Sequence, residues 1–167
     1  MREVVLELAA EMAVVVGAVE EVSEARALAT RALDDGRASE RFARMVRSQG
    51  GDERALHEPE RMGVAPEKTA VTADRDGFVA GFDPRILGHA VVEMGGGRTA
   101  LGQSIDVRVG FELHVDPGDR VTAGQPLGTV HAADVDGAAI GAARLQAAAA
   151  IEPELWPQKP LIRGRIV

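Results

Sequence analysis

The stretch MGGGRTALG, residues 94–102, contains the residue types of a phosphate-binding loop. Its three consecutive glycines could present backbone N–H groups to an anion, and Arg98 could add a positive charge. However, the stretch lacks the lysine–hydroxyl pair of a P-loop, and it follows a predicted helix where that motif requires a strand. We therefore predict that this stretch ends a helix, with Arg98 bonding to backbone carbonyls or to a carboxylate.

Two further sets of residues have metal-ligating side chains. The segment TADRDGFVAGFD places Asp74, Asp76 and Gly77 as in a calcium-binding loop. Thr72 would then be the first ligand, and Asp83 stands where a glutamate is required, so we predict two strands joined by a turn instead. The histidines lack the close spacings of a metal site, and ordinary surface or packed side chains are predicted for all of them. They are His57, His89, His114 and His131.

No arrangement of serine, histidine and acid typical of nucleophilic catalysis stands out in the sequence. Most of the cations are arginines on charged helical segments such as ERFARMVRS, residues 40–48, which is the pattern of a solvated face. We therefore predict no catalytic, cofactor-binding or metal-binding residue in this chain, and no cofactor.

Composition narrows the classes of function. The chain has 167 residues, enough for one medium domain or two small ones, and 46% of them are hydrophobic. A net charge of −7 argues against nucleic acid as a partner, since phosphate backbones are bound by excess cations. The sequence has no cysteine and no apolar window of membrane-spanning length. Because Glu3, Glu7 and Glu11 interrupt the first apolar run, we expect no secretory signal and a cytoplasmic protein.

The first third of the chain has the periodicity of helices. One helix is predicted over residues 2–17, a second from an N-cap at Ser23 to Gly36, and a third from about Ser39 to a left-handed C-cap at Gly50. The apolar face of the first helix is predicted to be Val5, Leu8, Met12 and Val15 or Val16.

The pattern changes after a polar segment with two prolines. Strands are predicted over residues 70–82, followed by a short helix with Asp83 as N-cap and Pro84 in its first turn. Further strands are predicted over 107–131, then an alanine-rich helix over 137–151 and a closing strand over 160–167. Helices followed by a β-rich unit predict an α+β chain. The predicted limits are 1–51 for a helical segment, 52–69 for a connecting segment and 70–167 for a β-rich domain.

The stretch HVDPGDRVTAGQPLG, residues 114–128, resembles the core of biotinyl and lipoyl carrier domains. Such domains present a modified lysine on a hairpin tip, at about the distance from Gly128 to Asp134. An aspartate cannot form the amide that carries biotin or lipoate. The two lysines of the chain, Lys68 and Lys159, are predicted to lie in loops elsewhere. The stretch therefore predicts a fold, not a site.

Several stretches, in one order, resemble pyrimidine-nucleoside and thymidine phosphorylases. Residues 32–52 resemble a late helix–loop–helix of the family, and residues 73–99 its strand, helix and glycine-rich turn with arginine. Residues 104–132 are similar to its Ile-Asp pair, Val-Gly and "GD-V--G--L--IH" core, and PLIRGRIV resembles its closing strand. Two departures are GGGR in place of Gly-Ala-Gly-Arg and Met94 where leucine is common. The likeness covers nearly the whole chain.

This resemblance implies a cytosolic homodimeric enzyme that cleaves pyrimidine nucleosides with phosphate, releasing the base and a pentose 1-phosphate. The family's phosphate-binding and base-binding residues precede everything matched here, so none is carried over. The resemblance thus implies a carboxy-terminal fragment: helices left from the α/β domain, then a domain of barrel-sandwich or hammerhead type. We expect it to be structural, inactive alone and dependent on the missing amino-terminal half. Its helices over residues 2–49 should expose an apolar face that this half covers.

Two alternatives stay open: a free-standing barrel-sandwich binding or adaptor module, and a carrier domain. Whether the chain itself is an enzyme is left undecided, although the parent family consists of pentosyltransferases. Phosphate and pyrimidine nucleoside are expected as partners only within a complete enzyme, with neither nucleic acid nor membrane as a partner.

Overall fold

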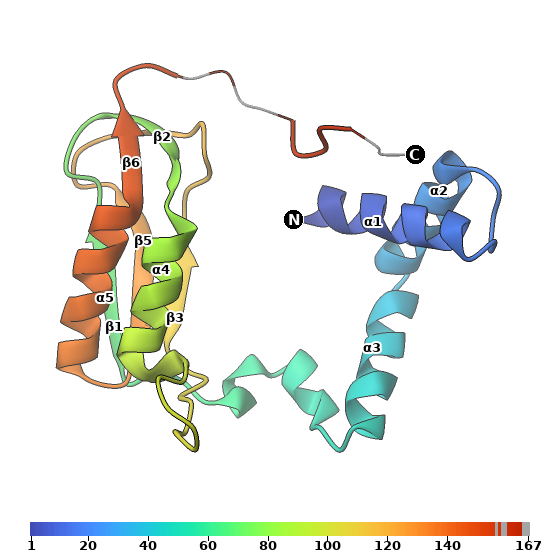
Figure 1. Cartoon of the computed structure of the whole chain (residues 1–167), viewed down its shortest axis with the longest axis horizontal. Coiled ribbons are helices and arrows are strands. Elements are labelled where there is room, and N and C mark those ends of the chain that lie inside the picture. Colours follow the sequence, from blue (N-terminus) through green and yellow to red (C-terminus); the bar gives the residue numbers. More distant parts are fainter. Residues whose placement is uncertain (156, 158–159, 165–167) are drawn as a thin grey trace. The chain divides into compact units, whose positions relative to one another are not determined.

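A computed structural model describes residues 1–155, 157 and 160–164 of the chain (Figure 1). The chain forms two compact units, with Met1–Glu58 in the first and Pro59–Gln158 in the second. The boundary between them falls inside the segment 52–69 that the sequence predicts to be connecting. The predicted domain limits at 51 and 70 themselves stay a prediction.

The first unit is helical. It contains α1 (Arg2–Val15), α2 (Val22–Asp34), α3 (Arg37–Ser48) and the short 3-10 helix η1 (Glu53–Leu56). Helices α1 and α2 pack together, and the residues buried on them are Leu6, Ala10 and Ala25. Gly50 has the left-handed conformation predicted for it, with φ +80°. The predicted N-cap Ser23 is wrong: α2 begins at Val22 with Glu21 as its N-cap, so Ser23 lies inside the first turn.

The second unit contains two antiparallel sheets of three strands. One has the order β1-β5-β3, formed by Glu67–Thr72, Pro126–Ala132 and Gly110–Leu113. The other has the order β4-β2-β6, formed by Arg120–Val121, Gly77–Phe82 and Ala149–Glu152. The two strands predicted over 70–82 exist as β1 and β2, but they belong to different sheets because the segment between them crosses from one sheet to the other.

Two helices lie side by side next to the first sheet, α4 (Pro84–Val91) and α5 (Val135–Ala148) (Figure 1). Asp83 caps α4 as predicted, because its Oδ1 accepts hydrogen bonds from the N–H groups of Arg85 and Ile86. The predicted helix 137–151 ends earlier than expected. Ala149 is extended and begins β6, which pairs with β2.

Two apolar cores hold this unit together. One contains Val71, Met94, Val109, Val130 and Leu145. The other contains Ala73, Val79, Val115, Val121 and Leu127. Phe82, at the end of β2, packs against both clusters, and β5 supplies Val130 to one and Leu127 to the other. These residues are three apart on one strand, so their side chains point to opposite faces of the sheet. β5 is thus the element that both cores share.

The predicted α+β class is confirmed at the level of mixed helices and sheets. Within the part of the chain that the structure describes, the strands form two separate sheets and no closed barrel. The closing strand predicted over 160–167 is absent from residues 160–164, and the rest of it lies outside the described residues.

Candidate functional surfaces

The glycine-rich stretch after α4 is a helix end, as predicted. It begins with a π-type turn, η3 (Val92–Gly96), in which Gly95 adopts φ +95°. A Cβ on Gly96 would lie 2.6 Å from Val91 Cγ1 and 2.8 Å from Val109 Cγ2. Arg98 Nε donates to the carbonyl oxygen of Gln103 at 3.2 Å. The glycines therefore serve a tight turn and close packing, and Arg98 holds the loop that follows.

Asp74 and Asp76, from the segment compared above with a calcium-binding loop, have different hydrogen-bond partners. Asp76 Oδ1 accepts a hydrogen bond from the N–H of Ala123 at 2.7 Å, which ties the β1–β2 connection to the turn before β5. Asp74 binds the neighbouring Arg75 instead. Among the residues that the structure describes, no group of three or more histidine, aspartate and glutamate side chains could hold a metal ion.

The four histidines are dispersed over the molecule. His57, His89 and His114 are exposed, and His131 is half-buried. His131 Nε2 lies 3.6 Å from Glu112 Oε2, and His114 Nε2 lies 3.3 Å from Thr129 Oγ1. The first pair joins β3 and β5, and the second joins β5 to the residue that follows β3. That the four histidines are ordinary surface or packed side chains stays a prediction.

The position of a carrier lysine is occupied by a helix cap. Asp134 is the N-cap of α5, and its Oδ1 accepts a hydrogen bond from the N–H of Gly137 at 2.7 Å. A helix therefore begins where a carrier domain would have a hairpin tip. Lys68 lies in strand β1, not in the predicted loop. Lys159 lies outside the described residues.

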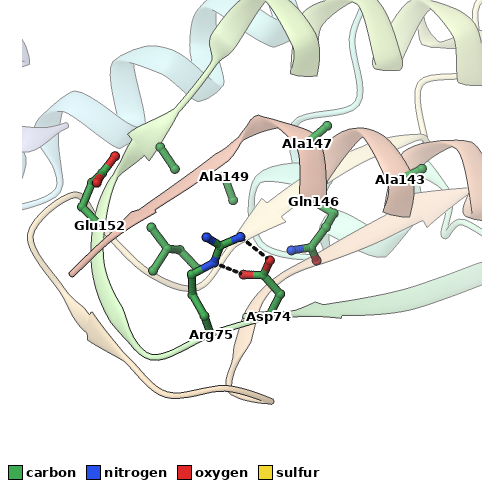
Figure 2. A pocket seen from close by; sticks show the side chains of 9 residues that line it. Asp74, Arg75, Ala143, Gln146, Ala147, Ala149 and Glu152 are labelled. Carbon is green, nitrogen blue, oxygen red and sulfur yellow. Dashed lines mark hydrogen bonds and ion pairs between the residues drawn. The ribbon is translucent and has the colours of Figure 1, made fainter.

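A pocket of about 420 Å³ lies beside the end of α5, β6 and the β1–β2 connection (Figure 2). Arg75 donates to Asp74 through Nε at 3.0 Å and Nη2 at 2.7 Å, and Gln146 and Glu152 complete the polar lining. The hydrogen bond from Arg75 lowers the pKa of the Asp74 carboxyl, and the same bond raises the pKa of Arg75. The Asp74 carboxylate is thus paired with the Arg75 guanidinium within the pocket lining. The pocket is an open depression with a polar lining.

Sequence reasoning singled out Asp74 but missed this pocket. Its lining comes from residues 74–75 and 143–152, which meet only because β6 pairs with β2 and α5 packs on β1. No periodicity or local motif carries that information. A second cavity, of about 390 Å³, lies along α4 and α5. There Arg144 binds both carboxylate oxygens of Glu93 at 3.0 Å, which links α5 to the turn after α4.

The Asp106 carboxyl, in the loop before β3, has a lowered pKa. Hydrogen bonds from the Arg108 side chain and backbone N–H lower the pKa of its carboxyl from 3.8 to about 2. A lowered folded-state pKa means that Asp106 stabilises the fold above about pH 4, and that this contribution disappears as the pH falls through about 2.

We expect Arg108→Gln to raise the pKa of Asp106, measured by the carboxyl ¹³C shift during an acid titration. The value should stay below 3.8, because the backbone hydrogen bond remains. Arg120→Gln, on β4, is the control and should leave the titration unchanged. An Asp106 carboxyl that titrates near 3.8 in the unsubstituted chain would refute the assignment.

The comparisons with known proteins define the class of this chain. Residues 78–152 match the family described as the pyrimidine nucleoside phosphorylase C-terminal domain. The chain therefore carries the C-terminal domain of the pyrimidine nucleoside phosphorylases, and the resemblance is confirmed. The matched segment extends from β2 to β6 and contains α4 and α5.

The particular relatives are thymidine phosphorylases. The chain is 44% identical to that of Burkholderia lata over 140 residues, which are 83% of this chain and 32% of the relative. It is 39% identical to that of Sinorhizobium medicae over 165 residues, 98% of this chain and 38% of the relative. The chain thus spans about a third of the length of the curated relatives that it matches. None of the helices in the described residues has the length and apolar character needed to cross a membrane.

Proposed function

We propose that this chain is the noncatalytic, carboxy-terminal portion of a pyrimidine-nucleoside phosphorylase. The parent reaction converts a nucleoside and phosphate to a base and a pentose 1-phosphate. The role of this portion is structural: it completes the larger domain of a cytoplasmic, homodimeric enzyme. The portion itself has a β-rich domain of barrel-sandwich or hammerhead type. The observation that carries the proposal is the match of 98% of this chain to 38% of one thymidine phosphorylase.

The arginines support a structural role. Phosphorolysis requires groups that bind a phosphate dianion and groups that neutralise charge on the departing base. Here Arg75, Arg108 and Arg144 each direct two nitrogens to a carboxylate of the chain itself. Each bidentate pair uses two N–H donors of the guanidinium, and the carboxylate offsets the positive charge that would attract a phosphate dianion. In the described part of the chain, moreover, no charged or polar residue is buried away from water.

A chimera tests the proposal. This chain would replace the matching segment of the Sinorhizobium medicae thymidine phosphorylase. Thymidine phosphorolysis should remain within about tenfold of the parent rate, a change of about 1.4 kcal/mol in activation free energy. The 167-residue chain alone should release no thymine from thymidine and phosphate.

Two results would contradict this proposal. One is turnover by the isolated chain at a rate similar to that of the parent enzyme. The other is a chimera that has the circular dichroism spectrum and cooperative unfolding of a folded protein but does not cleave thymidine. The unaltered Sinorhizobium medicae enzyme and its version truncated before the matched segment serve as the controls.

A further inference from the structure

Helix α1 has apolar residues on two opposite faces. Its inner face, with Leu6 and Ala10, is buried in the contact with α2. Its outer face has relative exposures between 45% and 81%. We define the α1 outer face as Val5, Leu8, Met12, Val15 and Val16. These are the residues that the sequence predicts as the apolar face of this helix, yet they are not the ones that pack on α2.

Two charged side chains of α1 also contact α2. Arg2 forms an ion pair with Asp34 at the end of α2, with Nη2 and Oδ1 2.6 Å apart, and Glu7 pairs with Arg26 of α2. In a surface helix the charges face water and the apolar stripe faces the protein. In α1 these charges contact the neighbouring helix, while large aliphatic side chains are exposed to water. A helix that is apolar on both sides is normally covered on both.

The relatives indicate what covers the outer face. Nearly all of this chain, from the α1 region onward, matches a thymidine phosphorylase, but about three fifths of that relative has no counterpart here. A second copy of this chain is a poorer occupant, because each copy carries a net charge of −7 and like charges oppose association.

We propose that the α1 outer face is the docking surface for the remaining, catalytic part of a phosphorylase. This inference rests on the proposed function and specifies where the two parts join. The complementary surface is a cluster of aliphatic or aromatic side chains, with an excess of cations at its rim that complements the negative charge of this chain.

Co-purification tests the docking surface. The probe is the part of the Sinorhizobium medicae thymidine phosphorylase that has no match in this chain, co-expressed with the full 167-residue chain. We expect a stable complex with the unsubstituted chain. The double variant Leu8→Glu, Met12→Glu should bind at least about tenfold more weakly, because it places two carboxylates in an apolar contact.

The matched control is the double variant Val135→Glu, Leu155→Glu, which adds the same charge at exposed aliphatic residues of the second unit. It should bind like the unsubstituted chain. Leu8 and Met12 are 59% and 68% exposed, so their substitution should leave the helical circular dichroism signal unchanged. That signal separates a lost contact from a lost fold.

Three results would overturn this inference. They are the absence of a complex with the unsubstituted chain, a complex that Leu8→Glu, Met12→Glu leaves intact, and a dimer of the chain alone that this variant dissociates in sedimentation. The chimera of the preceding section joins the two parts covalently, so its activity reports on the proposed function independently. An active chimera combined with any of these three results would refute the docking surface alone.

Discussion

Replacing Leu145 with alanine is expected to lower the free energy of unfolding by about 2–5 kcal/mol. Leu145 is fully buried on α5 and packs with Val130 of β5 and Met94 of the turn after α4. The substitution removes apolar contacts and leaves a cavity that the surrounding sheet cannot close, since its strands are held in register by hydrogen bonds.

The measurement is equilibrium unfolding in urea, and the matched control is Leu101→Ala. Leu101 lies in the loop after the glycine-rich turn and is fully exposed, so its truncation should change the free energy of unfolding by no more than about 0.5 kcal/mol. Equal effects of the two substitutions would show that α5 does not cover the β1-β5-β3 sheet.

Gly141→Ala is expected to destabilise the chain by about 1–3 kcal/mol. Gly141 is buried on α5, and a Cβ there would overlap Val130 Cγ1 and lie 2.6 Å from Met94 Sδ. Alanine has the higher helix propensity, by about 1 kcal/mol, so the steric overlap must exceed this gain. The absence of a Cβ at residue 141 is what lets α5 approach the sheet.

The same substitution at Gly88 provides the control and should have the opposite sign. Gly88 lies inside α4, is exposed, and has nothing within 4 Å of the position that a Cβ would occupy. Gly88→Ala should therefore raise the free energy of unfolding by about 0.5–1 kcal/mol. Thermal unfolding of both variants measures the two changes in stability. A stabilised Gly141→Ala protein would mean that α5 lies farther from β5 than the structure shows.

Several features could be predicted because neighbouring residues determine them. Asp83 starts α4 by accepting hydrogen bonds from the first turn, and Pro84 has a backbone φ that suits a first helical position. Gly50 ends α3 because its conformation is strained for other residues. The glycine-rich turn after α4 ends that helix for the same reason, since Gly95 adopts φ +95°. The likeness to the phosphorylases could also be read from the order of short motifs, and the comparisons confirm it.

Sequence reasoning failed where distant residues compete. Strand pairing with β2 takes Ala149 out of the predicted helix, and Lys68 becomes part of β1 through its pairing with β5. The N-cap of α2 is Glu21 although Ser23 has the better capping side chain, a choice for which the local sequence offers no signal. Hydrogen bonds between strands outweigh intrinsic helix propensities, which differ by less than about 1 kcal/mol per residue for most residue types.

The sequence alone therefore determined the start of α4, the glycine-rich turn after it, the α+β class and the family, because these depend on short motifs and their order. Only the tertiary structure decided which sheet each strand joins, which residues line the pocket beside Arg75, and which side of α1 packs on α2. Periodicity shows that a helix has an apolar face but not what that face contacts. Which surfaces pack together depends on burial between segments that are far apart in the chain, and a local sequence pattern does not encode it.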